Sequence, residues 1–164
     1  MPAGNGSGLL SPRTWQPFPG MPGFSIFPEI RKADVISSNA YLIRTTDFLL
    51  LIDPGGLASQ AELLTAEIAP FFAAGGLPLL VLLTHAHVDH FTALQEDPLF
   101  LDTGRVAIAV QETGARAIEQ HDTALTQAEL IGRDYKPLPV GVRLFSDGEY
   151  PEGKSLREIA LPSG

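Results

Sequence analysis

Cysteine is missing from the 164-residue sequence. Its absence excludes disulfides, cysteine-ligated zinc, iron–sulfur clusters and thiol nucleophiles, so a bound metal has to be held by nitrogen and oxygen ligands. Long apolar runs are missing as well, because the stretches 48–52 and 77–83 are far shorter than the roughly 20 residues that cross a bilayer. No association with a membrane is therefore expected.

A secretory pattern is also lacking, since no basic region is followed by an apolar stretch and a small-residue cleavage site. Basic residues are few: 11 Lys and Arg stand against 19 Asp and Glu, which gives a net charge of −8. They form no stripe that could follow a phosphate backbone. We therefore expect a cytoplasmic protein that acts on a small-molecule substrate and does not bind nucleic acid.

The composition is that of one globular domain preceded by an arm. Hydrophobic residues make up 45% of the chain and charged residues 18%, which is typical of folded proteins. Residues 1–23 contain five prolines and five glycines, which predicts a flexible arm without regular structure. Residues 24–164 are predicted to form the domain.

Hydrophobic patterning in the domain predicts alternating strands and helices, and therefore an α/β fold with a ligand site outside the carboxyl ends of the strands. A capping box from Ser59 to Glu62 predicts the start of a helix that Pro70 kinks or shortens and Gly75-Gly76 ends. The continuous apolar run at 77–83 predicts a strand covered by helices on both faces. The predicted strands are 24–27, 40–43, 48–52, 77–83, 106–110, 142–145 and 156–161. A tight turn at 45–47 joins the second strand to the third. The further predicted helices are 113–120 and 123–131.

Three of the four histidines lie within six residues of one another in the segment 84–90, THAHVDH. Residues two apart in extended backbone project to the same side, so His85 and His87 can aim their imidazoles at one point. Asp89 and His90 can aim at a neighbouring point. Imidazole and carboxylate groups suit zinc, and a catalytic zinc keeps three protein ligands and one open position. The cluster therefore predicts part of a site for one or two metal ions, with further ligands from elsewhere in the molecule.

The alternative is that these residues are ordinary polar side chains whose hydrogen bonds are satisfied within a loop. Three histidines and an aspartate so close together favour metal binding over that alternative. The fourth histidine, His121, is interpreted as a solvated histidine on the next helix. A role for it as a completing ligand is the less favoured alternative.

The segment 84–90 resembles the HxHxDH metal signature of the metallo-β-lactamase superfamily. Two other regions are similar to that family in order and spacing. Residues 39–43 followed by 51–55 resemble its early strands and the Asp-Gly turn that ends them, and residues 145–149 followed by 156–161 resemble the strand pair before its next histidine. The resemblance implies the N-terminal half of a four-layer αββα sandwich, with a mixed sheet and flanking helices.

Carried over to this sequence, the resemblance implies that His85 and His87 bind a first metal and that Asp89 and His90 bind a second. With a single metal, Asp89 would instead orient the attacking water. Asp53 would lie in the floor of the site and hold ligands by hydrogen bonds, and a simple cap of a strand-to-helix turn is an equally good interpretation. The implied activity is hydrolysis of a small ester, thioester, lactone or amide by metal-activated water, with zinc, iron or manganese as the ion.

The sequence departs from the family in two places. It ends at Gly164, where the family continues into a Gly-His-Thr motif that carries the third ligand of the first metal. We therefore expect a truncated form of a larger hydrolase, and we do not expect the 164-residue chain alone to be a complete enzyme. The alternative is a non-catalytic half-domain that assembles with a partner or with a second copy. Phe91-Thr92 replaces a glycine pair common in the family's hydrolases, which keeps an iron-dependent persulfide dioxygenase as a further alternative.

Overall fold

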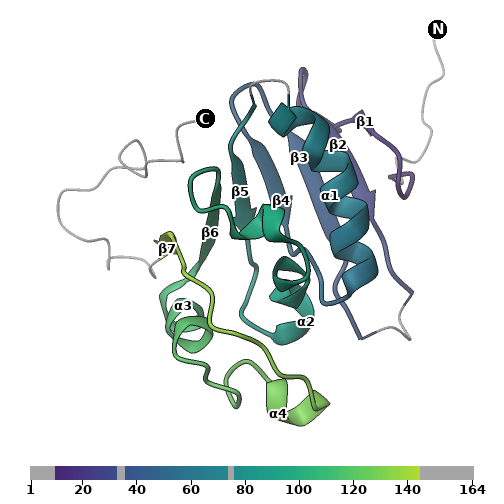
Figure 1. Cartoon of the computed structure of the whole chain (residues 1–164). Coiled ribbons are helices and arrows are strands. Elements are labelled where there is room, and N and C mark those ends of the chain that lie inside the picture. Colours follow the sequence, from purple (N-terminus) through teal and green to yellow (C-terminus); the bar gives the residue numbers. More distant parts are fainter. Residues whose placement is uncertain (1–9, 33–35, 74–75, 145–164) are drawn as a thin grey trace, which may run out of the picture.

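The computed structural model describes residues 10–32, 36–73 and 76–144 and contains a seven-stranded sheet whose spatial order follows the chain. The first four strands pair antiparallel, and the pairs from β4 to β7 are parallel (Figure 1). The mixed sheet of the expected α/β fold is therefore confirmed. The strands are β1 (Gln16–Pro17), β2 (Ser25–Glu29), β3 (Ala40–Arg44), β4 (Leu49–Ile52), β5 (Leu79–Leu82), β6 (Val106–Gln111) and β7 (Val142–Leu144).

Helices and short helical turns connect the parallel strands. They are α1 (Ala58–Ala73), α2 (Val88–Phe91), the 3₁₀ turns η1 (Thr92–Gln95) and η2 (Pro98–Leu101), α3 (Glu112–Glu119) and α4 (Ala128–Ile131). Parallel strands require such crossover connections, whereas the antiparallel strands β3 and β4 are joined by the expected tight turn. In that turn the Thr45 hydroxyl accepts hydrogen bonds from the amides of Asp47 and Phe48.

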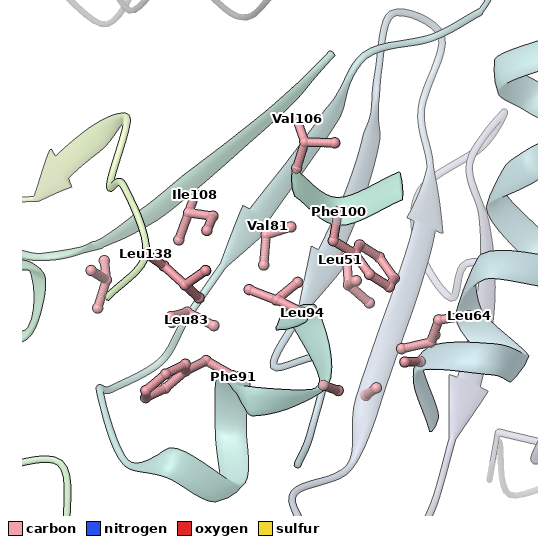
Figure 2. Close-up of a cluster of buried hydrophobic side chains, with 14 of the residues drawn as sticks. Leu51, Leu64, Val81, Leu83, Phe91, Leu94, Phe100, Val106, Ile108 and Leu138 are labelled. Atoms are coloured by element: carbon pink, nitrogen blue, oxygen red, sulfur yellow. The ribbon is translucent and has the colours of Figure 1, made fainter. Parts of the chain in front are cut away.

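The hydrophobic core lies between one face of the sheet and the helices (Figure 2). Leu51, Val81 and Ile108 occupy neighbouring positions on β4, β5 and β6 and all point to this face. Leu64 of α1 and Phe91 of α2 pack against the same cluster. This one layer of helices on one sheet fixes the carboxyl ends of the three central strands relative to one another.

The prediction that the 77–83 strand is covered by helices on both faces is wrong for the described residues. Leu79 and Val81 are fully buried, but the alternate residues Leu80 and Leu82 are only half-buried. Their neighbours across the sheet, Leu50 and Ile52, are half-buried in the same way. The continuous apolar run therefore reflects a second sheet face that is apolar without lying under a described helix.

The start of α1 differs from the predicted capping box. Ser59 and Glu62 lie inside the helix, and the first amides, those of Gln60 and Ala61, donate to the carbonyl of Leu57. The helix also continues through Pro70 to Ala73, so the proline does not end it. Packing of its buried face against the core outweighs these local signals.

The predicted helix 123–131 is reduced to the four residues of α4. Gln127 has a left-handed backbone (φ 58°), which a continuous α-helix cannot contain. The Thr126 amide and hydroxyl both donate to the carbonyl of Asp122, and the Thr126 carbonyl accepts from the amide of Val88 at 3.0 Å. The segment is therefore shaped by its contact with the histidine-bearing loop. Helix 113–120 is confirmed within one residue as α3.

Part of the expected arm is ordered against the domain. Gln16 and Pro17 form β1 and pair with β2, contrary to the expectation of no regular structure. The Trp15 ring lies 5.7 Å from that of Phe27 and 5.9 Å from that of Phe71, and its Nε1 donates to Glu67 at 2.7 Å. The large apolar area of one tryptophan explains how a proline-rich and glycine-rich segment is held in place.

The structure leaves some predictions outside its described part. Gly75, Phe145, the segment 145–149 and the strand 156–161 lie outside the described residues. Among the residues that are described, no helix has the length and hydropathy needed to cross a membrane.

We expect Trp15→Ala to lower the free energy of unfolding by about 2 kcal/mol, because a half-buried tryptophan loses its ring contacts and one hydrogen bond. Urea denaturation measures this change. Leu130→Ala serves as the control, since Leu130 is 78% exposed and its loss should change stability by less than about 0.5 kcal/mol. Equal stabilities of Trp15→Ala and wild type would show that the arm does not contribute to the fold.

Candidate functional site

The candidate site lies where the adjacent parallel strands β4 and β5 end. Asp53 follows β4 directly, and Thr84 comes two residues after β5 ends at Leu82. The Asp53 amide donates to the Leu82 carbonyl at 3.1 Å, so the two strand ends are bonded together. The histidine-bearing segment begins at this edge, as expected for a ligand site in an α/β sheet.

The Asp53 side chain connects the two strand ends to the histidines. Its Oδ1 accepts from the Thr84 amide at 2.8 Å, and its Oδ2 accepts from the Thr84 hydroxyl at 2.7 Å. Oδ2 also lies 3.1 Å from the buried Nδ1 of His90, a close contact without the geometry of a hydrogen bond. Asp53 is itself buried, at 7% exposure. It thus has the floor position that the sequence suggested, and it bonds across to β5 as well as ending β4.

The three clustered histidines lie against one another. The ring centroids of His85 and His87 are 4.4 Å apart, and those of His85 and His90 are 3.9 Å apart. His90 Nε2 lies 3.6 Å from Asp89 Oδ2. All four side chains are partly exposed. The structure therefore brings the four predicted ligands together beyond the carboxyl ends of β4 and β5.

The surroundings favour an ionised Asp53 and a neutral His85. Burial alone would raise the pKa of the Asp53 carboxyl group, but the contact with His90 and the two hydrogen bonds from Thr84 outweigh it and lower that pKa. Burial, followed by the charges of His90 and His87, lowers the pKa of His85. A neutral imidazole is the form that can bind a metal.

The Thr84 hydroxyl determines which nitrogen of His85 carries the proton. An ionised carboxylate only accepts hydrogen bonds, so the single hydroxyl proton of Thr84 is directed to Asp53. The oxygen of Thr84, 3.0 Å from His85 Nδ1, is then left to accept, which requires a proton on Nδ1. His85 Nε2 therefore keeps its lone pair for a ligand.

Backbone bonds position the other half of the cluster. The Ser38 amide donates to the Asp89 carbonyl at 3.0 Å, and the Gly55 amide donates to the His90 carbonyl at 3.1 Å. Gly56 also lies so close to α2 that a Cβ atom there would be 3.0 Å from the Cα of Asp89. The turn at residues 53–56 is thus packed directly under the helix that carries Asp89 and His90.

The donor set suits a metal in kind but does not form a complete ligand set on its own. In residues 10–32, 36–73 and 76–144, no three His, Cys, Asp or Glu side chains are arranged to hold an ion by themselves. His85 nevertheless has a defined tautomer, and Asp53 is a buried carboxylate that contacts His90 and Thr84, and such supporting contacts are what metal ligands generally require. Further ligands have to complete the shell, as the sequence suggested.

His121 does not join the cluster. It follows α3 in a turn with a left-handed backbone (φ 57°), so it is not helical as predicted. Its side chain is 40% exposed, and its Nε2 lies 2.8 Å from Asp134 Oδ1. The hydrogen bond to His121 lowers the pKa of the Asp134 carboxyl group and outweighs the opposite effect of burial. The prediction of a solvated histidine is confirmed.

Thr92, part of the departure from the family pattern, is buried away from the cluster. Its hydroxyl donates to the Val88 carbonyl at 2.8 Å and lies 3.4 Å from the Gly56 carbonyl. These contacts join α2 to the turn below it. They give a structural reason for a threonine at this position and do not separate a hydrolase from a dioxygenase.

An open cleft of about 360 Å³ lies beside the paired histidines. Its walls come from the ends of β5 and β6 and from α3, and it includes Gln111, Thr113 and Leu125 together with His85 and His87. Sequence reasoning did not identify these lining residues, because they are brought to the site only by the pairing of β5 with β6.

Comparison with known proteins gives the same family as the sequence signature at 84–90. The sequence profile described as the metallo-beta-lactamase superfamily matches residues 33–163. The chain belongs to this superfamily. A probable metallo-hydrolase, YqgX of Bacillus subtilis (strain 168), is 41% identical over 61 residues, which are 37% of this chain and 26% of that protein.

Two solved metallo-β-lactamases share the fold. One, a HARLDQ-motif mutant from Cronobacter sakazakii, is 21% identical and has a TM-score of 0.51. The match covers 82% of this chain and 48% of that protein. The other, native FEZ-1 from Legionella gormanii, is 17% identical and has a TM-score of 0.52. The match covers 76% of this chain and 44% of that protein. This superfamily member thus spans about half the length of these structures and about a quarter of the curated relative.

We expect Thr84→Val to abolish the preference of His85 for a proton on Nδ1, because the hydroxyl that accepts from it becomes a methyl group. Imidazole ¹⁵N shifts of metal-free protein at about pH 8, where an ordinary histidine is neutral, report the tautomer. Thr84→Ser should retain the wild-type tautomer, and His87 should be unchanged in both variants. A wild-type pattern for His85 in Thr84→Val would contradict the relay through Thr84.

Proposed function

We propose that this chain supplies the HxHxDH part of a metal-dependent hydrolase centre that acts on a small ester, thioester, lactone or amide. The observation that carries the proposal is the gathering of His87 and His90 around His85, at ring-centroid distances of 4.4 and 3.9 Å, beside a buried, ionised Asp53. Membership of the superfamily and the similarity to a probable metallo-hydrolase support it.

In this proposal each residue has a defined task. His85 and His87 hold a first ion, and Asp89 and His90 hold a second, or Asp89 orients the attacking water when one ion is present. Asp53 fixes His85 through the Thr84 hydroxyl and His90 by direct contact. A bound ion of this kind lowers the pKa of water and polarises the bond under attack. Zinc is the first candidate for the ion, and the nitrogen and oxygen ligands also suit iron or manganese.

The cleft beside His85 and His87 is the proposed location of the acyl part of the substrate. Its wall combines the apolar side chains of Val110 and Leu125 with the polar groups of Gln111 and Thr113. Such a mixture of apolar lining and a few polar groups is typical of small-molecule sites. The substrate's reacting bond would then lie next to the imidazoles.

A second candidate is a non-catalytic half-domain that assembles through the other face of the sheet. The half-buried apolar side chains Leu50, Ile52, Leu80 and Leu82 favour a further layer on that face. A second copy of the chain or a partner protein would supply it. This candidate predicts neither bound metal nor turnover, so the following two experiments separate it from the hydrolase.

The full-length protein, in which further ligands complete the shell, is expected to contain about one or two metal ions per chain and to lose hydrolysis when a chelator removes them. Elemental analysis by mass spectrometry gives the metal content, and a panel of small esters, thioesters, lactones and amides gives the activity. Return of activity on adding zinc, iron or manganese identifies the ion that works. Full turnover in chelator-treated, metal-free protein would exclude the proposal.

His87→Ala should lower the metal content and reduce kcat/KM by more than about 100-fold, because a ligand of the first ion is lost. His121→Ala is the matched control, since it removes the one histidine that bonds away from the cluster. It should retain both metal and turnover. If His87→Ala kept both at the level of His121→Ala, the assignment of the ligands would be wrong.

A further inference from the structure

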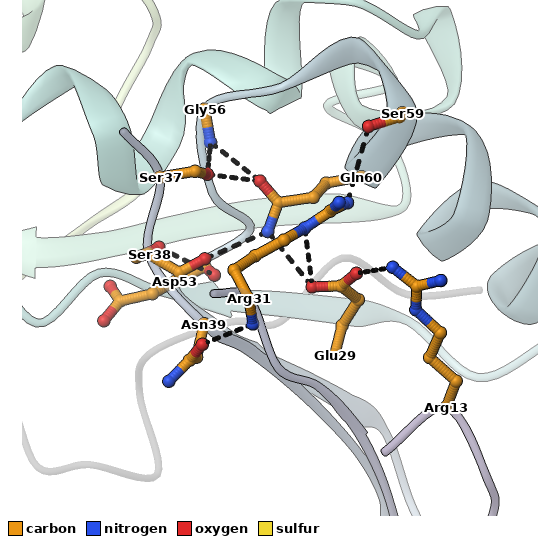
Figure 3. A network of polar contacts seen from close by, with 10 residues as sticks. All are labelled: Arg13, Glu29, Arg31, Ser37, Ser38, Asn39, Asp53, Gly56, Ser59 and Gln60. Carbon is orange, nitrogen blue, oxygen red and sulfur yellow. Dashed lines mark hydrogen bonds and ion pairs between the residues drawn. The ribbon is translucent and has the colours of Figure 1, made fainter. Parts of the chain in front are cut away.

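Gln60, in the first turn of α1, is fully buried at 0% exposure and bonded through every polar atom of its side chain (Figure 3). Its Oε1 accepts from the Ser37 hydroxyl and, at 3.2 Å, from the Gly56 amide. Its Nε2 donates to the Ser38 carbonyl at 3.0 Å and to Glu29 Oε2 at 3.4 Å. One amide group thus joins three separate segments of the chain.

Two of these segments hold the backbone of the Asp89 and His90 half of the site. The segment with Ser37 and Ser38 binds the Asp89 carbonyl through the Ser38 amide, at 3.0 Å. The turn at 53–56 binds the His90 carbonyl through the Gly55 amide, at 3.1 Å. The Ser38 hydroxyl also lies 3.5 Å from the carbonyl of Asp53. Gln60 therefore reaches the ligand-bearing helix by two routes, one through Ser38 and one through Gly56 and Gly55.

The packing of Gln60 also determines the shape of the turn. Gly55 has φ +87°, and a Cβ atom placed on it would come within 2.2 Å of Gln60 Oε1. The side-chain amide of Gln60 therefore fills the space that a side chain at position 55 would need. A side chain at position 55 would therefore displace the Gln60 amide and its bonds to Ser37, Ser38 and Gly56.

A buried ion cluster fixes the other side of the Gln60 amide. Glu29 is fully buried and paired with Arg13 at 2.9 Å and Arg31 at 3.0 Å. Its Oε2 accepts from Gln60 Nε2, so the orientation of the amide is set: the oxygen faces Ser37 and Gly56, and the amino group faces Glu29. Every polar atom of the Gln60 amide is bonded, which favours one arrangement of the network. Arg31 Nε pairs with Glu29 by charge, without the geometry of a hydrogen bond.

We propose that Gln60 is a positioning residue that sets the Asp89 and His90 side of the candidate centre, through the Ser37–Ser38 segment and the 53–56 turn. The inference rests on the proposed function for the use of those two side chains. Within the described residues, the Gln60 side chain makes no hydrogen bond to an imidazole. His85 is oriented separately by Thr84, so the two halves of the site have different supports.

Gln60→Met tests the proposal, because it keeps the length of the side chain and removes all four bonds. The measurements are made on chelator-treated protein by NMR, with ring signals of the histidines and amide exchange as readouts. We expect the His90 ring signals to move, while His85 keeps its proton on Nδ1 and the ring signals of His121, which bonds to Asp134 away from the cluster, stay in place. Exchange of the Ser38 and Gly55 amides should become about tenfold faster, with the Leu83 amide, bonded to Ala109, as the unchanged reference.

Gln16→Met is the matched control, since Gln16 also bonds backbone through its amide, at Ser11 and Thr14, but lies on β1. It should leave all these signals in place. A Gln60→Met protein that only melts at lower temperature, with wild-type His90 signals and Ser38 exchange, would overturn the proposal and leave Gln60 a stabilising residue.

Ser37→Ala decides the matter if Gln60→Met does not fold. It removes only the hydroxyl that contacts Gln60 Oε1 and accepts from the Gly56 amide at 2.8 Å. The same signals should change by a smaller amount, and no change in them would overturn the proposal. All readings are taken without metal, so a failure of hydrolysis or of metal binding would count against the proposed function and not against the role of Gln60.

Discussion

The carboxylate of Asp53 is the interaction on which the site depends. It receives two hydrogen bonds from Thr84 at the end of the neighbouring strand and lies 3.1 Å from His90. These contacts join two parallel strands and two ends of the histidine segment through one buried charge. A buried carboxylate is stable only with such partners. The same bonds that make its burial tolerable therefore also fix the directions of the imidazoles.

The backbone around Asp53 is as constrained as its side chain. Asp53 has a left-handed φ of 47°, which an aspartate tolerates better than most residues but which still has an energetic cost. Gly55 and Gly56 follow because Gln60 and Asp89 occupy the space where their side chains would lie. Strain of this kind persists where the surroundings determine the conformation fully. The conformation of the turn is thus set by its contacts with Thr84, Gln60 and α2, and a link between β4 and α1 alone would not require the strained backbone at Asp53.

Local patterns in the sequence predicted the features that depend on local physics. Strand periodicity gave the central strands, and two-residue spacing in extended backbone placed His85 beside His87. The predictions failed where distant contacts decide the structure. Trp15 docks through residues far along the chain, and residues 123–127 form turns because Thr126 accepts from Val88. Gln60 was missed for the same reason, since its partners come from three segments whose proximity no periodicity in the sequence reveals.

The two halves of the cluster are supported in different ways, and this difference has consequences for how the site tolerates change. His85 depends on a side-chain relay through Thr84, a single hydroxyl at the exposed edge of the sheet. Asp89 and His90 depend on backbone bonds from Ser38 and Gly55, which rest on the buried network around Gln60 and Glu29. Exposed single bonds contribute little energy and are replaced by water at low cost, whereas a buried network loses several bonds together. The orientation of His85 therefore rests on one bond that water can replace, while the Asp89 and His90 half holds a geometry fixed by the fold.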